Sequence, residues 1–275
     1  MRALAVAMFW ITSAFGQQIV GIANPALGIA SFPVGYSPQL APGSLVRIIW
    51  SAPDIGRPYP PDVSIGFQPG ASDRFFKAQV LSPTPDGEIV AIIPRDMPLG
   101  ASNMVLVLNA TAFPPAQVEI VNASIGIFTV SGSGAGPALA QNVSGSQVVL
   151  NQLTSPALPG EYVTLWATGL GAYATTDSNV VVGGERIQPS FAGPAPTLPG
   201  VDQINFQMPA DAPYGCYVPV TVSAGDSTSN AVTIATAAAT GACSFGHNLF
   251  PLVRNIPGRS MLRNLPISDL YVLVE

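Results

Sequence analysis

The chain has 275 residues, of which 9% are charged and 48% hydrophobic, and it contains 27 glycines and 28 prolines. Disordered chains combine low hydrophobicity with high charge, so this composition excludes disorder and is typical of a β-rich protein with many turns. Only 10 basic residues stand against 15 acidic ones, and the isoelectric point is near 4.7. Without a basic patch to neutralise phosphates, nucleic acid is not expected as a partner.

The first residues have the features of a secretory signal peptide. Met1-Arg2 gives a short positive end, Ala3–Phe15 is apolar, and Ala14-Phe15-Gly16 supplies the small residues that suit cleavage. An apolar stretch of about 13 residues is shorter than the roughly 20 that a membrane-spanning helix needs. We therefore predict a signal peptide at residues 1–16 and a secreted, periplasmic or cell-surface location without a membrane span.

The sequence contains an internal duplication. The run Ile89–Gly100 returns as Ile204–Gly215, with its two prolines, its aspartate and its glycine at a constant interval of 115 positions. Two valines beyond each run match at the same interval, Val105 with Val220 and Val107 with Val222. An earlier block, Pro42–Ile48, returns as Pro159–Leu165 at an interval of 117. A constant interval is the mark of a tandem repeat, so the chain is two copies of one small domain.

A segment rich in glycine and serine, Ser131–Pro137, separates the two copies. We predict the first domain over residues 17–131, the second over 132–240, and a tail at 241–275 that matches neither copy. The residues just before the separator, 118–130, are compatible with the end of the first copy or with the start of the second.

Short β-branched and aromatic runs bounded by proline and glycine predict strands at Leu45–Trp50 and Tyr162–Ala167. The segment Val180–Ile187 has two central glycines, which suit the positive φ angles of a tight hairpin turn. A further strand is predicted at Ala231–Ile234. Asn24–Gln39 lacks helical periodicity and is expected to wrap the first domain.

Polar and apolar residues alternate strictly in Gln203–Met208, so Ile204, Phe206 and Met208 are expected to face inward. The equivalent positions of the first copy are Ile89, Ala91 and Ile93. About seven short strands per copy and no helical pattern within the repeats predict an all-β chain of two tandem immunoglobulin-like β-sandwiches with an irregular C-terminal tail.

The two cysteines, Cys216 and Cys243, are predicted to form a disulfide, because exported proteins seldom keep unpaired cysteines. Alternation along the strand from Cys216 places this residue on the same face as Val218, Val220 and Val222, which we take as the core face. The bond would fasten the segment after the last strand to the second domain. The alternative is a pair of free buried thiols.

Several blocks of the sequence resemble the Solibacter-type uncharacterised C-terminal domain family of acidobacterial exported proteins. The matching blocks are Ala41–Val46, Pro159–Gly171, Val182–Gly184, Phe191–Pro194, Asp202–Pro209, Gly215–Val220 and Ser229-Asn230. The string Gly-Glu-Tyr-Val-Thr-Leu-Trp-Ala-Thr-Gly-Leu-Gly at 160–171 is the most specific, and the second copy matches better than the first. The first copy departs from the pattern at Trp50–Ile55. The resemblance implies a pair of immunoglobulin-like domains, and the family has no established activity to transfer.

Candidate catalytic residues are few. His247 is the only histidine, lies in the unmatched tail, and has no nucleophile-elbow motif beside it, so it is expected to be a solvated side chain. Asp202 and Asp211 are the acids most worth weighing as a glycosidase pair. Asp211, like Asp96, stands in a Pro-x-Asp-x-Pro-x-Gly corner, where an aspartate commonly stabilises a turn. We therefore predict that the protein is not an enzyme.

No cofactor is expected. The two polar segments that could offer calcium ligands, Thr175–Asn179 and Asp226–Asn230, contain too few carboxylates and are more simply connections between strands. Zinc would need four ligands, which one histidine and two bonded cysteines cannot supply.

Aromatic side chains in loops could form a platform for a carbohydrate. The possible ligand-facing residues are Tyr36, Tyr59, Phe67 and Tyr173. Phe75 and Phe76 are explained equally well by core packing, and Trp166 is the poorest candidate because its strand is apolar. The sequence thus predicts a non-catalytic exported module that contacts a protein or the cell surface, with carbohydrate binding through loop aromatics as the alternative and a hydrolase ranked third.

Overall fold

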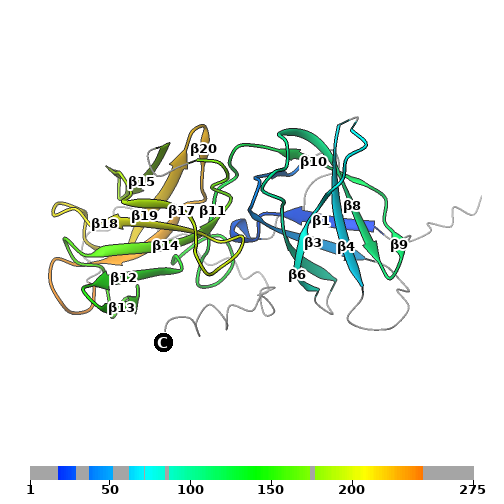
Figure 1. Ribbon diagram of the computed structural model, residues 1–275. Helices are drawn as coiled ribbons and strands as arrows, with labels where there is room; N and C mark the ends of the chain where they lie inside the picture. The colour runs from blue at the N-terminus through cyan, green and yellow to red at the C-terminus, as the bar shows by residue number, and fades with distance from the viewer. Residues whose placement is uncertain are drawn as a thin grey trace, which may run out of the picture.

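The computed structural model describes residues 18–28, 37–51, 62–70, 72–83, 87–173 and 177–243. The 3-10 turn η1 (Pro25–Leu27) is the one helical element that lies wholly within these ranges, and the strands form four sheets that face one another in pairs. Figure 1 shows the two resulting sandwiches side by side. The predicted fold class, two tandem immunoglobulin-like β-sandwiches, is confirmed. The predicted signal peptide and all but the first three residues of the predicted tail lie outside the described residues.

The first sandwich has one sheet in the order β1 (Gln18–Ala23), β3 (Leu45–Ser51), β7 (Glu88–Ile92) and β6 (Gln79–Pro83). The facing sheet has the order β2 (Gln39–Leu40), β10 (Ala116–Ile120), β8 (Gly100–Leu108), β4 (Val63–Pro69) and β5 (Phe76–Lys77), with β9 (Thr111–Ala112) beside β8. Strand β2 runs parallel to β10, and the other pairs are antiparallel.

The second sandwich has one sheet in the order β13 (Gln147–Leu150), β12 (Ala140–Ser144), β14 (Tyr162–Thr168), β18 (Asp202–Gln207) and β17 (Phe191–Pro194), with β11 (Gly126–Ile127) beside β14. The facing sheet has the order β16 (Glu185–Ile187), β15 (Ser178–Val182), β19 (Gly215–Ala224) and β20 (Ser227–Thr228), with β21 (Val232–Thr236) also on β19. The predicted hairpin is confirmed as β15 and β16, which pair across Gly183-Gly184.

The strand order is that of an immunoglobulin-like domain, in which a sheet of strands A, B, E and D faces a sheet built around C, F and G. In the first sandwich β1, β3, β7 and β6 are A, B, E and D, and β4, β8 and β10 are C, F and G. In the second, β12, β14, β18 and β17 face β15, β19 and β21 in the same way. The blocks duplicated in the sequence fall on the equivalent strands B, E and F, so the repeat reflects one fold used twice.

Each sandwich has a core of its own between its two sheets. The predicted inward residues are confirmed: Ile89, Ala91, Ile93, Ile204 and Phe206 are fully buried, and Met208 is 2% exposed. Burying a side chain of this size contributes about 1.5–3 kcal/mol relative to leaving it in water. The alternation seen in the sequence therefore follows directly from one face of each strand E meeting the core.

The environment predicted for Cys216 is wrong in one respect. Cys216 is buried, but it packs with Ala235 and Cys243 and not in the core that holds Val218 and Val220. The reason is a β-bulge, because the pairing of β19 with β21 shifts register between Gly215 and Val218. A bulge inserts one residue and so breaks the alternation of faces.

The same inserted residue shifts the buried positions of strand F in the second copy by one residue relative to the sequence repeat. At an interval of 115 positions, Val105 and Val107 correspond to Val220 and Val222, yet the first two valines are only partly buried whereas the last two are fully buried. In the first copy the fully buried residues of this strand are Met104, Leu106 and Leu108.

The segment between the two copies divides near residue 121. Ala116–Ile120 pairs with β8 in the first sandwich, whereas Gly126–Ile127 pairs with β14 in the second. Ala123 and Ile125 also pack into the second core. Residues 118–130, which the sequence left open as the end of the first copy or the start of the second, are thus divided between the two sandwiches.

Candidate functional site

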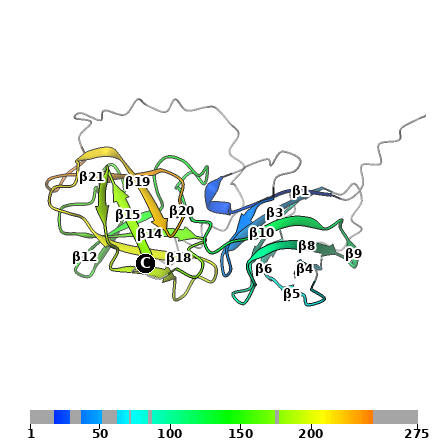
Figure 2. The same cartoon turned by 90° about the horizontal axis from the view of Figure 1, so that it is seen from above.

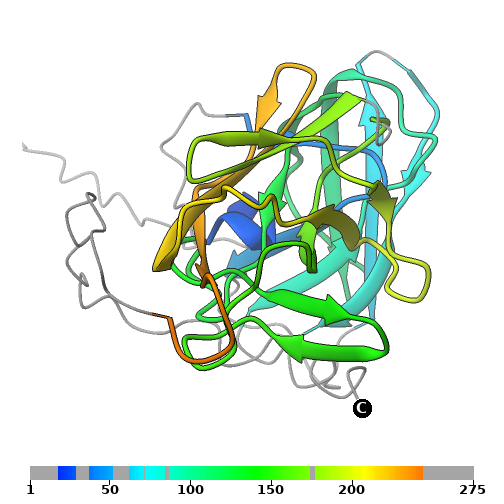
Figure 3. The same ribbon diagram turned by 90° about the vertical axis from the view of Figure 1, so that its left-hand side faces the viewer.

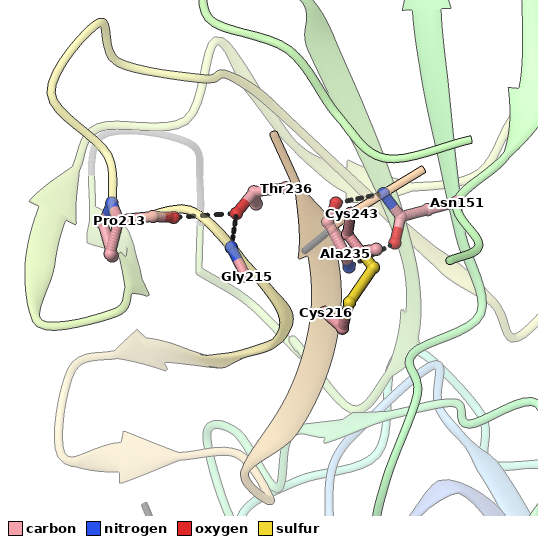
Figure 4. The surroundings of a disulfide bond; sticks show 7 residues. All are labelled: Asn151, Pro213, Gly215, Cys216, Ala235, Thr236 and Cys243. Carbon is pink, nitrogen blue, oxygen red and sulfur yellow. Dashed lines mark hydrogen bonds between the residues drawn. A yellow bond between two sulfur atoms is a disulfide. The ribbon is translucent and has the colours of Figure 1, made fainter. Parts of the chain in front are cut away.

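The predicted disulfide between Cys216 and Cys243 is confirmed, with its Cα atoms 5.2 Å apart. Figure 4 shows the bond beside Asn151, whose Oδ1 accepts from the Ala235 N–H at 2.8 Å and whose Nδ2 donates to the Ala235 carbonyl at 2.9 Å. The Cys243 N–H donates to the Leu153 carbonyl at 2.9 Å. The disulfide and these hydrogen bonds fasten β19, β21 and the segment after β13 into one unit.

The two sandwiches meet along an apolar contact that we call the seam. Figure 2 shows them side by side with η1 between them. The seam consists of Leu45, Val90 and Ile92 from the first sandwich and Phe128, Trp166, Ala195, Leu198 and Val201 from the second. Gly200 lies directly against Leu45, since a Cβ atom on Gly200 would come within 2.6 Å of Leu45 Cδ2. The seam therefore holds the outer face of β3 and β7 against the loop between β17 and β18.

Thr168, at the end of β14, makes the central polar contact of the seam. Its Oγ1 accepts from the Leu45 N–H of the first sandwich at 2.9 Å and donates to the Gly200 carbonyl at 2.6 Å. Thr168 is fully buried. Water cannot replace these two hydrogen bonds without opening the seam.

Two glycines after Thr168 pack against the segment that connects the two sandwiches. Gly169 and Gly171 have φ angles of 91° and 67°, and a Cβ on either would overlap a backbone carbonyl oxygen, that of Ser124 or of Asn122 respectively. The Ser124 N–H donates to the Gly169 carbonyl at 2.8 Å, and Asn24 Nδ2 donates to the Ser124 carbonyl at 2.7 Å. The end of the string at 160–171 thus lies at the domain junction.

We expect Thr168→Val to lower the free energy of unfolding by about 2 kcal/mol, because the isosteric side chain leaves two buried backbone groups without partners. Thr233→Val is the matched control, since the buried Thr233 Oγ1 has no hydrogen-bond partner among the described residues. Its expected effect is close to zero. Urea unfolding of both variants is the measurement, and equal losses would show that the Thr168 hydrogen bonds do not stabilise the seam.

Asp202, one of the two acids weighed for catalysis, is part of this junction. It is 8% exposed, and its Oδ2 accepts from the Leu170 N–H at 2.7 Å. Burial raises the pKa of Asp202 to about 6, against the opposing effects of the backbone hydrogen bonds from Leu170 and Gly169 and of the Arg95 charge. The carboxyl group therefore orders the turn after β14 and does not face a cleft.

The raised pKa gives a pH prediction. Folded Asp202 binds a proton below about pH 6, whereas in the unfolded chain it does so only below about pH 4. This residue therefore favours the folded state at low pH, and its contribution is lost as the pH rises from about 4 to about 6. Asp202→Asn should remove that dependence. The difference in unfolding free energy between the native protein and the variant, measured at intervals from pH 4 to 8, should change within this window and be constant above it; a difference constant throughout would contradict the assignment.

The other candidate catalytic and metal-binding residues do not form a site in the described part of the chain. His247 and residues 175–176 of the first calcium candidate lie outside the described residues. In the second candidate, Asn230 bonds the backbone of Ile127 through Oδ1 at 2.7 Å and Nδ2 at 3.0 Å. Asp96 forms an exposed ion pair with Arg74 at 3.4 Å. No group of three or more His, Cys, Asp or Glu side chains suited to a metal occurs among the described residues.

The predicted ligand-facing aromatics do not gather into one surface. Tyr36 and Tyr59 lie outside the described residues. Phe67 is fully buried in the first core, so its assignment to a ligand surface is wrong; it occupies an inward position of β4. Tyr173 is partly buried against the second core and its ring lies next to Gly225. Of the neighbouring pair, Phe76 is 7% exposed and Phe75 is 58% exposed.

A different set of aromatics lies on the outer face of the sheet β13-β12-β14-β18-β17. We call this outer face the amide face. Strand alternation and pairing place on it the outward residues Gln141, Val143, Val148, Leu150, Tyr162, Thr164, Trp166, Phe191, Gln203, Asn205 and Gln207. In Figure 1 the strands β12, β13 and β14 form the lower layer of the left-hand sandwich, and Figure 3 shows the β12–β13 hairpin at its lower edge. The only charged residue on these five strands is Asp202, which is buried.

Hydrogen bonds order the polar side chains of the amide face. Asn205 Oδ1 accepts from Thr164 Oγ1 at 2.9 Å and from Gln203 Nε2 at 3.0 Å. Trp166 Nε1 donates to Gln141 Oε1 at 3.2 Å. Trp166 is half-buried where the amide face meets the seam, although the apolar sequence of its strand made it the poorest candidate for a ligand-facing aromatic.

No protein-family model matches the sequence, and no curated protein matches it. Among solved structures, the chain is similar to a Bacteroides ovatus mixed-linkage glucan utilization locus protein, SGBP-B, in complex with a mixed-linkage heptasaccharide (15% identity, TM-score 0.33), over 75% of this chain and 46% of that one. It is also similar to domains 5-6 of the S-layer protein SbsC (14% identity, TM-score 0.31), over 82% of this chain and 100% of that one. A tandem of titin domains I9–I11 matches at 10% identity and a TM-score of 0.19, over 74% of this chain and 96% of that one. The strand order of the two sandwiches identifies the immunoglobulin-like fold.

Among the described residues, no helix is both long and apolar enough to span a membrane.

Proposed function

We propose that this chain is a non-catalytic exported module that contacts a protein or the cell surface with two immunoglobulin-like domains held in one orientation. The observation that carries the proposal is the seam. Tandem domains move relative to one another by default unless their interface is apolar and extensive. Here eight apolar side chains and the buried Thr168 hydrogen bonds join the two sandwiches. A fixed pair presents surfaces of both domains to a partner at once.

Two further observations support export and a role other than catalysis. Disulfides persist in oxidising compartments, and Cys216–Cys243 is one. Asp202, the buried acid with a raised pKa, is used within the junction. The resemblance to the Solibacter-type family points the same way and stays a prediction. We infer a secreted, periplasmic or cell-surface location on these grounds.

The test is co-sedimentation of the full chain with the insoluble envelope fraction of the producing bacterium. The native protein should sediment with the envelope in a saturable way. Ala195→Glu, which forces a charge into the seam, should weaken binding several-fold by freeing the domains. Ala210→Glu is the matched control, because Ala210 is exposed in a turn, and it should bind like the native protein. Native protein that stays in the supernatant at every concentration would contradict the proposal.

A further inference from the structure

The amide face combines a polar surface with a complete lack of charge. Its outward positions hold five amide or hydroxyl side chains between apolar and aromatic ones, and no Lys, Arg, Asp or Glu. Gln203, Asn205 and Gln207 are at least partly exposed, whereas Gln141 and Thr164 are buried beneath them. Covering a charge with a ligand costs free energy unless the charge is paired, so such a face suits a ligand that is itself uncharged. An acidic polymer or a nucleic acid would find no cation here.

Aromatic side chains lie at the borders of the amide face. Tyr162 on β14 is 44% exposed, and Phe191 on the outermost strand β17 is 37% exposed. Trp166, two residues before the end of β14, is half-buried in the seam. The apolar faces of sugar rings pack well against such rings, which bury a large area at little cost in side-chain entropy. Tyr162 and Trp166 are four residues apart on one strand, a separation of about 13 Å.

The polar side chains between these aromatics offer both donors and acceptors. Both hydrogen bonds to Asn205 Oδ1 come from its neighbours, and its Nδ2 group has no partner among the described residues. Gln203 also keeps its Oε1 acceptor unpaired within the described part of the chain. Hydroxyl groups of a sugar both donate and accept, so an ordered row of amides can bind them.

We propose that the amide face binds a neutral, extended polysaccharide chain that lies along β14 from Tyr162 toward Trp166. The inference rests on the proposed function, because it names the ligand of that module. The ordering of Thr164, Asn205 and Gln203 by mutual hydrogen bonds means that the polar groups are in position before the ligand arrives, which reduces the entropy cost of binding.

The experiment is native gel electrophoresis of the full chain in gels that contain one soluble polysaccharide each: hydroxyethylcellulose, glucomannan, dextran or carboxymethylcellulose. Retardation by hydroxyethylcellulose or glucomannan, which are neutral and extended, is expected. Carboxymethylcellulose has the same backbone with added negative charges and should retard the protein less. Failure of both neutral extended polymers to retard the protein would overturn the proposal.

Variants locate the binding on the amide face. Tyr162→Ala and Phe191→Ala should each weaken retardation at least tenfold in polymer concentration. Tyr217→Ala is the matched control, because Tyr217 is 39% exposed on β19 in the opposite sheet, and it should leave retardation unchanged. Equal loss in all three variants, or no loss in the first two, would place the ligand elsewhere and overturn the assignment.

The outcome is distinguishable from failure of the proposed function. If the native protein sediments with the envelope but no neutral polysaccharide retards it, the module stands and its ligand is not a neutral extended polysaccharide. Loss of sedimentation after protease treatment of the envelope would then identify a protein partner. If neither assay shows binding, the proposed function fails as well.

Discussion

Gly169→Ala is expected to lower the free energy of unfolding by about 4 kcal/mol. The residue has a φ of 91°, which costs an alanine about 1–2 kcal/mol. The added Cβ would also overlap the Ser124 carbonyl oxygen, and a backbone atom that accepts from Asn24 cannot move aside without breaking the junction. Urea unfolding gives the loss, and small-angle scattering should show a larger radius of gyration for the folded variant.

Gly160→Ala separates the two causes. Gly160 has a φ of 82°, but an added Cβ there meets nothing within 4 Å. Only the backbone cost of about 1–2 kcal/mol should appear, with no change in the radius of gyration. If the two glycine variants lose equal stability and scatter alike, close packing at the junction is not what requires Gly169.

Replacing both Cys216 and Cys243 by serine is expected to lower the free energy of unfolding of the second sandwich by about 3–4 kcal/mol. The bond closes a loop between residues 27 apart, and its loss releases that loop in the unfolded chain. The segment at Cys243 would then be held by its backbone hydrogen bond to Leu153 and little else among the described residues. Thermal and urea unfolding of the variant give the loss.

Reduction of the native protein provides the control for these substitutions. A reductant should bring the unfolding midpoint of the native protein close to that of the double serine variant and should leave the variant unchanged. Identical midpoints for oxidised native protein and variant would show that the disulfide does not stabilise the second sandwich.

Much of the fold was predictable because immunoglobulin-like strands repeat a simple physical pattern. Ile204, Phe206 and Met208 alternate with polar residues, and one face of their strand meets a core. Strand β1 (Gln18–Ala23) was not predicted. Half of its six residues, a glutamine, a glycine and an alanine, have no β-branched or aromatic side chain, so the strand pattern is weak. The side of β19 that Cys216 occupies could not be predicted, because a bulge depends on pairing with β21 and leaves no mark in the local alternation.

The sites were harder to predict than the strands. The sequence placed the candidate ligand-facing aromatics in loops, whereas Phe67 is a core residue of β4. The exposed aromatics Tyr162 and Phe191 lie on strands of a sheet. The periodicity of one strand predicts which side of the sheet a residue occupies, but not which residues of neighbouring strands lie beside it. The period-two pattern of β14, in which Tyr162, Thr164 and Trp166 alternate with the core residues Val163 and Leu165, was the signal available. Similarly, the string at 160–171 could be recognised in the sequence, but the role of its Thr168 at the seam depends on the position of Leu45.

Residual dipolar couplings of backbone amides in a weakly aligned sample test the central claim most directly, because they report the orientation of each domain separately. If the seam holds the two sandwiches in one orientation, couplings from both domains fit a single alignment tensor on the coordinates. Two tensors that differ clearly in magnitude, together with different rotational correlation times for the two domains, would show that the sandwiches move independently.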